Sequence, residues 1–93
     1  MKRIQRKNFA DYSWKTNPNA VYVGRPSKWG NPFKLTEYTL GVALEKYGEW
    51  LTERLLNDPD FLLPLKGKDL VCFCPLDKPC HADILIKFVQ EMY

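Results

Sequence analysis

Two short apolar runs with a long helical pattern between them limit the fold more than any other feature of the sequence. Residues 20–23 and 70–74 are apolar and β-prone, while apolar side chains recur at steps of three and four over residues 40–55. A helix of that length returns the chain so that the second strand runs beside the first in the same direction. The sequence therefore predicts an α/β fold with an at least partly parallel sheet, a Rossmann-like fragment.

Shorter patterns predict the remaining elements. Residues 1–8 form a candidate first strand, and apolar residues at helical spacing predict a second helix over residues 81–93. Thr39 is expected to cap the first helix, and Asp58 is expected to cap a short helical turn through residues 59–63. The predicted order is β-β-α-β-α, with three strands and two main helices.

The length predicts one domain over residues 1–93, with a basic strand and loop at 1–19 and a β-α-β-α core at 20–92. Hydrophobic residues at 45% and charged residues at 27% exclude a disordered chain. No apolar run approaches the roughly 20 residues that span a bilayer, and the first residues lack the apolar stretch of a secretory signal. We expect a cytoplasmic protein without a membrane partner.

Charge is distributed unevenly along the chain. Residues 1–34 hold eight Lys and Arg against one Asp, a net charge of +7, whereas the remaining residues hold six against ten, a net charge of −4. Two interpretations of the first cations, Lys2, Arg3, Arg6 and Lys7, stay open. They form an anion-binding face suited to nucleotide phosphate or nucleic acid, or they are the solvated side chains of an edge strand.

The connection at 24–33, GRPSKWGNPF, contains more than a turn requires. Gly, Pro and Asn supply the turn, so Arg25, Lys28 and Trp29 are left for another purpose. Arg25 can bind a phosphate with two parallel hydrogen bonds and Lys28 adds charge, while Trp29 either stacks on a base or packs in the core. Asn31 either reads a base edge or closes its own turn. The candidate ligand-binding residues are Gly24, Arg25, Ser27, Lys28, Trp29, Gly30 and Asn31.

All three cysteines and the single histidine lie in one pattern, C-x-C-x5-C-H. An odd number of closely spaced cysteines does not form a disulfide framework. One interpretation is a metal site, with zinc as the candidate ion and Cys72, Cys74, Cys80 and His81 as its ligands, although the spacing departs from the usual x2 to x4 pattern.

Two other interpretations of this pattern remain open. Cys80 at the start of a helix is a candidate thiolate nucleophile, because the free N–H groups there stabilise an anion. His81 would then assist as a catalytic residue, and Asp83, one turn away, would orient it or simply interact with the helix dipole. Alternatively, Cys72 and Cys74 are small core residues without a chemical role.

Both unusual segments follow predicted strands. Ligands of open parallel sheets bind at the carboxyl ends of the strands, where the loops that lead into helices gather. The segment at 24–33 follows the strand at 20–23, and the segment CPLDKPCH, which contains Cys80 and His81, follows the strand at 70–74. We therefore expect the two segments to face one pocket.

The same segments carry a family resemblance. VYVGRPSKWGNPF, a Tyr-x-x-Trp-Leu helix at 47–51, LKGKDLVCFC and PCHADIL resemble the small bacterial and phage proteins grouped as domain of unknown function 4326. The resemblance covers residues 20–88 in order. Family members typically have Trp at the position of Phe73 and Gly at the position of Ala82. The resemblance implies a common pattern that includes Gly24, Arg25, Trp29, Gly30, Asn31, Pro32, Cys74, Cys80 and His81.

These observations predict a protein that binds a nucleotide or nucleic acid, with phosphate held by the GRPSKWGNP loop beside a Cys/His cluster that acts as a thiol nucleophile or a metal site. The alternative is a non-catalytic phage or bacterial binding or inhibitor protein, which sequesters a nucleotide signal or contacts a host protein and uses its cysteines only structurally. Whether the protein is an enzyme stays open at this stage. The edge of so small a sheet would also suit a homodimer.

Overall fold

The computed structural model describes all 93 residues, which form an α/β fold with three parallel strands and two long helices. The strands are β1 (Arg3–Gln5), β2 (Ala20–Tyr22) and β3 (Asp69–Cys72), and the helices are α1 (Leu40–Asn57) and α2 (His81–Met92). The chain order is therefore β-β-α-β-α, apart from two short 3-10 helices, and the predicted fold class is confirmed. No helix is long and apolar enough to cross a membrane.

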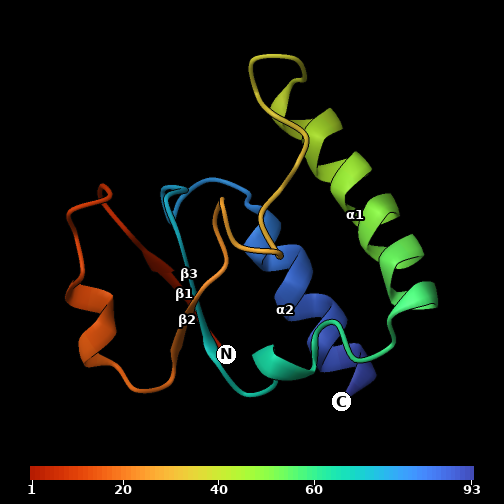
Figure 1. The fold of residues 1–93 in the computed structure, drawn as a ribbon. Helices are drawn as coiled ribbons and strands as arrows, with labels where there is room; N and C mark the ends of the chain where they lie inside the picture. The colour runs from red at the N-terminus through yellow and green to blue at the C-terminus, as the bar shows by residue number, and fades with distance from the viewer.

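The strand that comes last in the chain forms the centre of the sheet. The strand order of the sheet is β1-β3-β2. Leu70 of β3 lies opposite Arg3 of β1 on one side and opposite Val21 of β2 on the other. In Figure 1 both helices lie on the same side of the sheet, with α2 next to the strands and α1 outside α2. Val71 and Cys72 of the central strand are consequently buried as fully as Leu70. All three carboxyl ends point to one edge, where the loops to the helices begin.

Helix α1 forms as its periodicity predicts. Thr39 Oγ1 accepts a hydrogen bond from the backbone N–H of Val42 at 3.4 Å, which confirms Thr39 as the N-cap. One stripe of the helix is buried, through Ala43, Tyr47 and Leu51. The Tyr47 hydroxyl donates a hydrogen bond of 2.6 Å to a carbonyl of the 24–33 loop, so this stripe also holds the loop against the core.

Several predicted boundaries are wrong by a few residues. Of the candidate first strand at residues 1–8, only Arg3–Gln5 forms β1, because only these residues pair with β3. The short helical turn is the 3-10 helix η2 at Leu63–Leu65 rather than at residues 59–63, because a proline in its first turn favours a start there. The Asp58 side chain does not cap that turn; the Asp58 backbone N–H ends α1 by donating to Arg54. β3 ends at Cys72, and not at residue 74, because neither neighbouring strand offers a further ladder partner.

The loop before β2 contains a second 3-10 helix, η1 (Ser13–Thr16), which the sequence pattern did not predict. This segment packs around Arg6, whose side chain is buried. The Arg6 guanidinium donates hydrogen bonds to the backbone carbonyls of Asn8, Phe9 and Asp11 at 2.7 to 3.2 Å. Arg6 therefore orders the N-terminal loop, and its burial keeps it from binding an outside anion.

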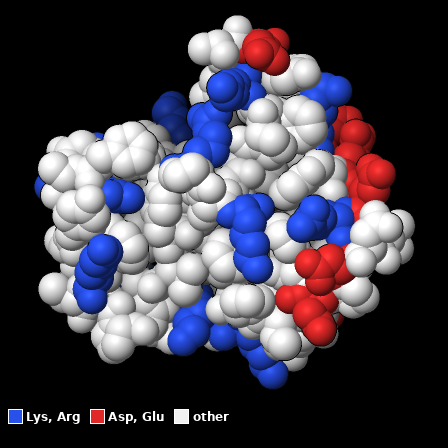
Figure 2. All heavy atoms as spheres, viewed as in Figure 1, with Lys and Arg blue, Asp and Glu red and all other residues white.

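Charged side chains are also unevenly distributed on the surface. On the face in Figure 2, Asp and Glu gather mainly along the right-hand edge, where α1 runs in the same view, whereas Lys and Arg are spread across the rest. This agrees with the basic first third and the acidic remainder of the sequence.

Candidate functional site

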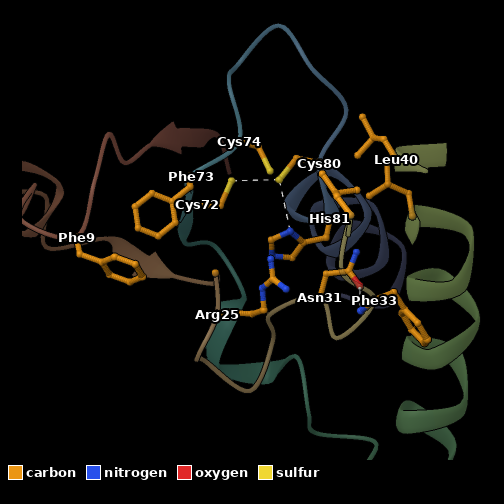
Figure 3. A pocket seen from close by; sticks show the side chains of 13 residues that line it. Phe9, Arg25, Asn31, Phe33, Leu40, Cys72, Phe73, Cys74, Cys80 and His81 are labelled. Atoms are coloured by element: carbon orange, nitrogen blue, oxygen red, sulfur yellow. Dashed lines mark hydrogen bonds between the residues drawn. The ribbon is translucent and has the colours of Figure 1, made fainter. Parts of the chain in front are cut away.

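A pocket of about 310 Å³ lies at the carboxyl edge of the sheet, between the two predicted loops. Figure 3 shows Phe9 and Phe73 on one side, Asn31, Phe33 and Leu40 on the other, and the cysteines above Arg25 and His81. Most of its lining is apolar. The lining residues are Phe9, Gly24, Arg25, Asn31, Phe33, Leu35, Leu40, Leu44, Cys72, Phe73, Cys74, Cys80 and His81. The structure thus confirms that the two loops meet at one pocket.

Arg25 is the cation of this pocket. Its guanidinium lies beside the His81 ring in Figure 3, and its side chain makes no hydrogen bond or ion pair with the rest of the chain. The backbone is held instead, because the Tyr22 hydroxyl donates a hydrogen bond of 2.6 Å to the Arg25 carbonyl. The donors of the guanidinium are therefore available to a ligand that enters the pocket.

The two glycines of the loop are required by close packing. A Cβ at Gly24 would collide with the Tyr22 hydroxyl, and a Cβ at Gly30 would lie 2.9 Å from Arg25 Cγ and 3.0 Å from Arg25 Cα. Neither glycine has a positive φ, which only Gly67 shows. Both glycines therefore serve the internal packing of the loop, and only Gly24 also lines the pocket.

Trp29 and Lys28 lie outside the pocket lining. The Trp29 indole N–H donates a hydrogen bond of 3.0 Å to the carbonyl of Phe61, and its ring packs against the core. Lys28 Nζ lies 4.9 Å from the centroid of the Trp29 ring and 5.6 Å from that of Phe61. The structure therefore places Trp29 in the packing role that the sequence left open, with Lys28 over it.

The two remaining polar residues of the loop take part in turns. The Ser27 backbone N–H donates to the carbonyl of Gly24 at 2.8 Å, while the Ser27 hydroxyl is buried without a partner and does not line the pocket. Asn31 Oδ1 accepts a hydrogen bond of 2.9 Å from the N–H of Phe33, so Asn31 closes its own turn. Asn31 nevertheless lines the pocket. Its side-chain Nδ2 donates a hydrogen bond to the carbonyl oxygen of Ala43, with 3.4 Å between the nitrogen and the oxygen.

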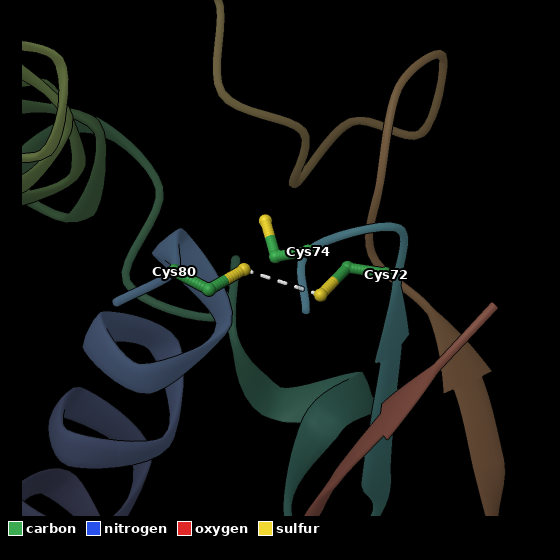
Figure 4. Close-up of side chains that lie close together, drawn as sticks. All are labelled: Cys72, Cys74 and Cys80. Carbon is green, nitrogen blue, oxygen red and sulfur yellow. Dashed lines mark hydrogen bonds between the residues drawn. The ribbon is translucent and has the colours of Figure 1, made fainter. Parts of the chain in front are cut away.

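The three cysteines come together at the wall of the pocket (Figure 4). Their Sγ atoms all lie within 4.8 Å of one another, and those of Cys72 and Cys80 are 3.1 Å apart. Cys72 ends β3, Cys74 follows in the turn, and Cys80 precedes the first residue of α2. All three are free thiols, and such a cluster could hold a metal ion.

The three thiols differ in acidity. The Cys72 and Cys80 thiols stabilise a thiolate at half-buried Cys74 and lower the pKa of Cys74. Conversely, interaction with Cys74 raises the pKa of Cys72 to about 11, and interaction with Cys72, together with burial, raises the pKa of Cys80. These directions favour ionisation of Cys74 over ionisation of Cys80 at the helix start.

His81 is held in one orientation. Its Nε2 lies 2.8 Å from the carbonyl oxygen of Val23, which can only accept, so Nε2 carries the hydrogen. In the neutral ring Nδ1 then has a free lone pair, and it lies 3.5 Å from Cys80 Sγ. In metal sites, the ring nitrogen of a histidine that does not bind the metal commonly donates a hydrogen bond to a backbone carbonyl in this way.

Arg3 and Asp83 hold the loop that carries the cysteines. Arg3 donates hydrogen bonds to the carbonyls of Pro75 and Lys78 at 2.7 and 2.8 Å, and pairs with the Asp83 carboxylate at 2.6 Å. The same Asp83 oxygen accepts a hydrogen bond from the backbone N–H of Cys80 at 3.1 Å. Asp83 does not line the pocket, so its interactions position Cys80.

Several pocket residues were not predicted from the sequence. Phe9, Phe33 and Leu35 lie in loops without periodicity, and Phe73 was considered only as part of a strand. The one available signal was a large apolar side chain among polar neighbours, as at Phe9 in the segment RKNFADY.

Comparison with known proteins connects this arrangement to a family and to nothing further. No curated protein and no solved structure matches the chain. A family described as a domain of unknown function, DUF4326, matches over residues 4–91. This span contains every residue of the strands and of the two long helices except Arg3 and Met92, and it contains the whole pocket lining. The chain therefore belongs to the DUF4326 family.

Proposed function

We propose that the protein binds a nucleotide in this pocket, with the ligand phosphate on Arg25 beside the Cys/His cluster. The observation that carries the proposal is the unpaired Arg25 guanidinium in a mainly apolar pocket. A guanidinium binds phosphate with two parallel hydrogen bonds, and the apolar lining beside the exposed Arg25 would strengthen both once a ligand excludes water. A volume of about 310 Å³ is at the lower end of the range for small-molecule sites, which favours a mononucleotide over an extended nucleic acid.

Zinc is the second candidate ligand, and the cysteine geometry favours it. Zn–S bonds of about 2.3 Å place tetrahedral sulfur ligands roughly 3.8 Å apart, a value between the 3.1 Å that separates the Sγ atoms of Cys72 and Cys80 and the 4.8 Å within which all three Sγ atoms lie. Cys72, Cys74 and Cys80 would hold the ion, with His81 Nδ1 as the fourth ligand after a small movement. Zinc would supply a structural link between β3 and α2.

The enzyme and the binding-protein interpretations differ in what Cys74 does. Cys74 is half-buried and lines the pocket, and the neighbouring thiols lower its pKa, so it is the sulfur best suited to attack a bound electrophile. In a non-catalytic protein that sequesters a nucleotide or contacts another protein, the same sulfur would only bind metal or pack. Turnover that disappears in Cys74→Ser while nucleotide affinity persists would support the enzyme.

Calorimetric titration with the four ribonucleoside 5′-monophosphates tests the proposed phosphate site. Arg25→Ala should weaken binding about 10- to 100-fold, the loss expected for a charge-assisted hydrogen-bonding group. Arg25→Lys should restore only part of the affinity, since an ammonium lacks the paired donors. Lys87→Ala, an exposed cation on α2 outside the pocket, is the control and should bind as the wild type does. Equal affinity of Arg25→Ala and wild type would refute the phosphate site.

Metal analysis of protein purified without chelator tests the zinc site separately. One zinc ion per chain is expected in the wild type and in Lys87→Ala, with most of it lost in Cys72→Ser and Cys74→Ser. Metal at full occupancy in both cysteine variants would place the ion elsewhere. A wild type that takes up no zinc even when the metal is added would leave the cysteines as free thiols.

A further inference from the structure

We infer that Phe9, supported by Phe73, forms the base-binding part of the pocket, so that the ligand is a nucleoside monophosphate with its base against the Phe9 ring. This inference rests on the proposed nucleotide function and names the class of ligand for that site. The sequence directed attention to Trp29 for stacking, but the Trp29 indole is bonded to the Phe61 carbonyl and lies outside the pocket lining.

Phe9 is exposed although it is a large apolar residue. Its side chain lines the pocket, yet 66% of the residue remains accessible to solvent. The Phe9 ring contacts the Phe73 ring edge to face, with ring centroids 4.9 Å apart and planes at 65°. Phe73 is supported in turn by the Tyr22 ring, 5.8 Å away. Phe9 is therefore the outermost ring of an aromatic cluster and has apolar surface left for a planar ligand.

Arg6 makes this exposed ring rigid. Its guanidinium lies 5.4 Å from the centroid of the Phe9 ring and 5.3 Å from that of Phe73. Arg6 also donates a hydrogen bond of 2.7 Å to the Phe9 carbonyl and others to the carbonyls of Asn8 and Asp11. The backbone at Phe9 is thus held on both sides before any ligand arrives. A preorganised ring reduces the entropy cost of binding.

The opposite wall and the cation complete the site. Leu35, 62% exposed, and Phe33 line the pocket with Phe9, and Figure 3 shows Arg25 between the Phe9 side and the Phe33 side. A flat aromatic ring can lie against Phe9 while an attached phosphate reaches Arg25. A sugar phosphate without a base would contact Arg25 but would leave Phe9 in water, so it should bind more weakly. The arrangement therefore selects an aromatic base and an anion in the same molecule.

The test compares each ribonucleoside 5′-monophosphate with ribose 5-phosphate by calorimetric titration. Wild-type protein should bind the tightest nucleotide at least 5-fold more tightly than ribose 5-phosphate. Phe9→Ala should weaken nucleotide binding roughly 5- to 150-fold, the range for loss of one base-stacking aromatic, and leave ribose 5-phosphate affinity unchanged. Phe9→Tyr should retain nucleotide binding. Tyr12→Ala is the matched control, since Tyr12 is 54% exposed and also contacts Arg6 but does not line the pocket.

The outcomes separate this inference from the proposed function. If Arg25→Ala weakens every phosphate ligand while Phe9→Ala weakens none, the phosphate site stands and the base site at Phe9 is overturned. Equal wild-type affinity for nucleotides and ribose 5-phosphate overturns the base site as well. If the wild type binds none of these ligands at millimolar concentration, the proposed nucleotide function and the base site both fail.

Discussion

Replacing Arg3 by alanine should loosen the loop that positions the cysteines. Arg3 reaches from β1 across the sheet edge to three acceptors: two backbone carbonyls between Cys74 and Cys80, and the Asp83 carboxylate. Its side chain is only 8% exposed, whereas that of Asp83 is 54% exposed. In the alanine variant the Lys78 carbonyl would lose its protein partner, and Asp83 would keep only its hydrogen bond with the N–H of Cys80.

The magnitude follows from these contacts. A hydrogen bond to a charged group contributes about 1.5–3 kcal/mol, but the Asp83 carboxylate is partly solvated in either variant, so we expect a total loss of about 2 kcal/mol. A domain of this size has a free energy of unfolding of roughly 5–14 kcal/mol, so the loss is substantial. It corresponds to a fall in Tm of about 8–16 °C. If the loop opens locally, the labelling rate of the buried Cys80 thiol should rise about 30-fold.

Circular dichroism melts and thiol labelling of metal-free protein measure the two effects. Lys2→Ala is the matched control. The Lys2 side chain makes no hydrogen bond or ion pair, and only its backbone is bonded, through its N–H to Asp69 and through its carbonyl to the N–H of Leu70, so both readouts should stay near wild type. Arg3→Lys should recover part of the Tm. Loss of a residue that holds metal ligands in place typically weakens metal affinity about 10- to 100-fold, so zinc affinity should fall in Arg3→Ala if the cluster binds zinc. A Tm within about 2 °C of wild type together with unchanged labelling would refute this role of Arg3.

Other variants test the packing and the electrostatics of the fold. Gly30→Ala should destabilise the protein and weaken phosphate binding, because the added Cβ would lie 3.0 Å from the Arg25 backbone. Gly48→Ala is the opposite case: an added Cβ there meets open space on α1, so the free energy of unfolding should rise by about 0.5–1 kcal/mol in urea titrations. Hydrogen bonds from Ser13 lower the pKa of Asp11 from 3.8 to about 2, so they stabilise the fold above about pH 4 and this contribution is lost as the pH falls through 2. Asp11→Asn should therefore lose less stability than wild type between pH 7 and pH 2, and an equal loss would contradict this assignment.

The parts of the fold that depend on local pattern could be predicted. Helix α1 has one apolar stripe and a threonine at its start, so its bounds at Leu40–Asn57 follow from nearby residues alone. The ends of β3 could not be predicted in the same way. Whether a strand continues past Cys72 depends on the neighbouring strands, and the last ladder bonds come from Arg6 and Val23, far away in sequence. Strand ends are set by pairing rather than by the apolar run.

The 24–33 loop shows a similar limit for the site. Its composition indicated that Arg25, Lys28 and Trp29 are not needed to form the turn. In the structure, the Arg25 side chain lines the pocket without an ion-pair partner. The sequence could not show that Trp29 turns the other way. That orientation depends on the Phe61 carbonyl, which binds the indole, and on the Tyr47 hydroxyl, which binds the Trp29 carbonyl. Both partners are 18 or more residues away in sequence.

The cysteine cluster was predicted on a premise that the structure corrects. The predicted strand at residues 70–74 included both Cys72 and Cys74, but β3 ends at Cys72 and Cys74 lies in the turn that follows. The sulfurs still meet because Arg3 holds this turn, and because Cys80, as the N-cap of α2, is directed back toward β3. The cluster therefore depends on the contacts between β1, β3 and α2 as well as on the spacing C-x-C-x5-C. We expect a chain with the same cysteine spacing but without an arginine at the position of Arg3 to hold its three thiols together less firmly. The basic strand β1 is therefore part of the site, although none of its residues lines the pocket.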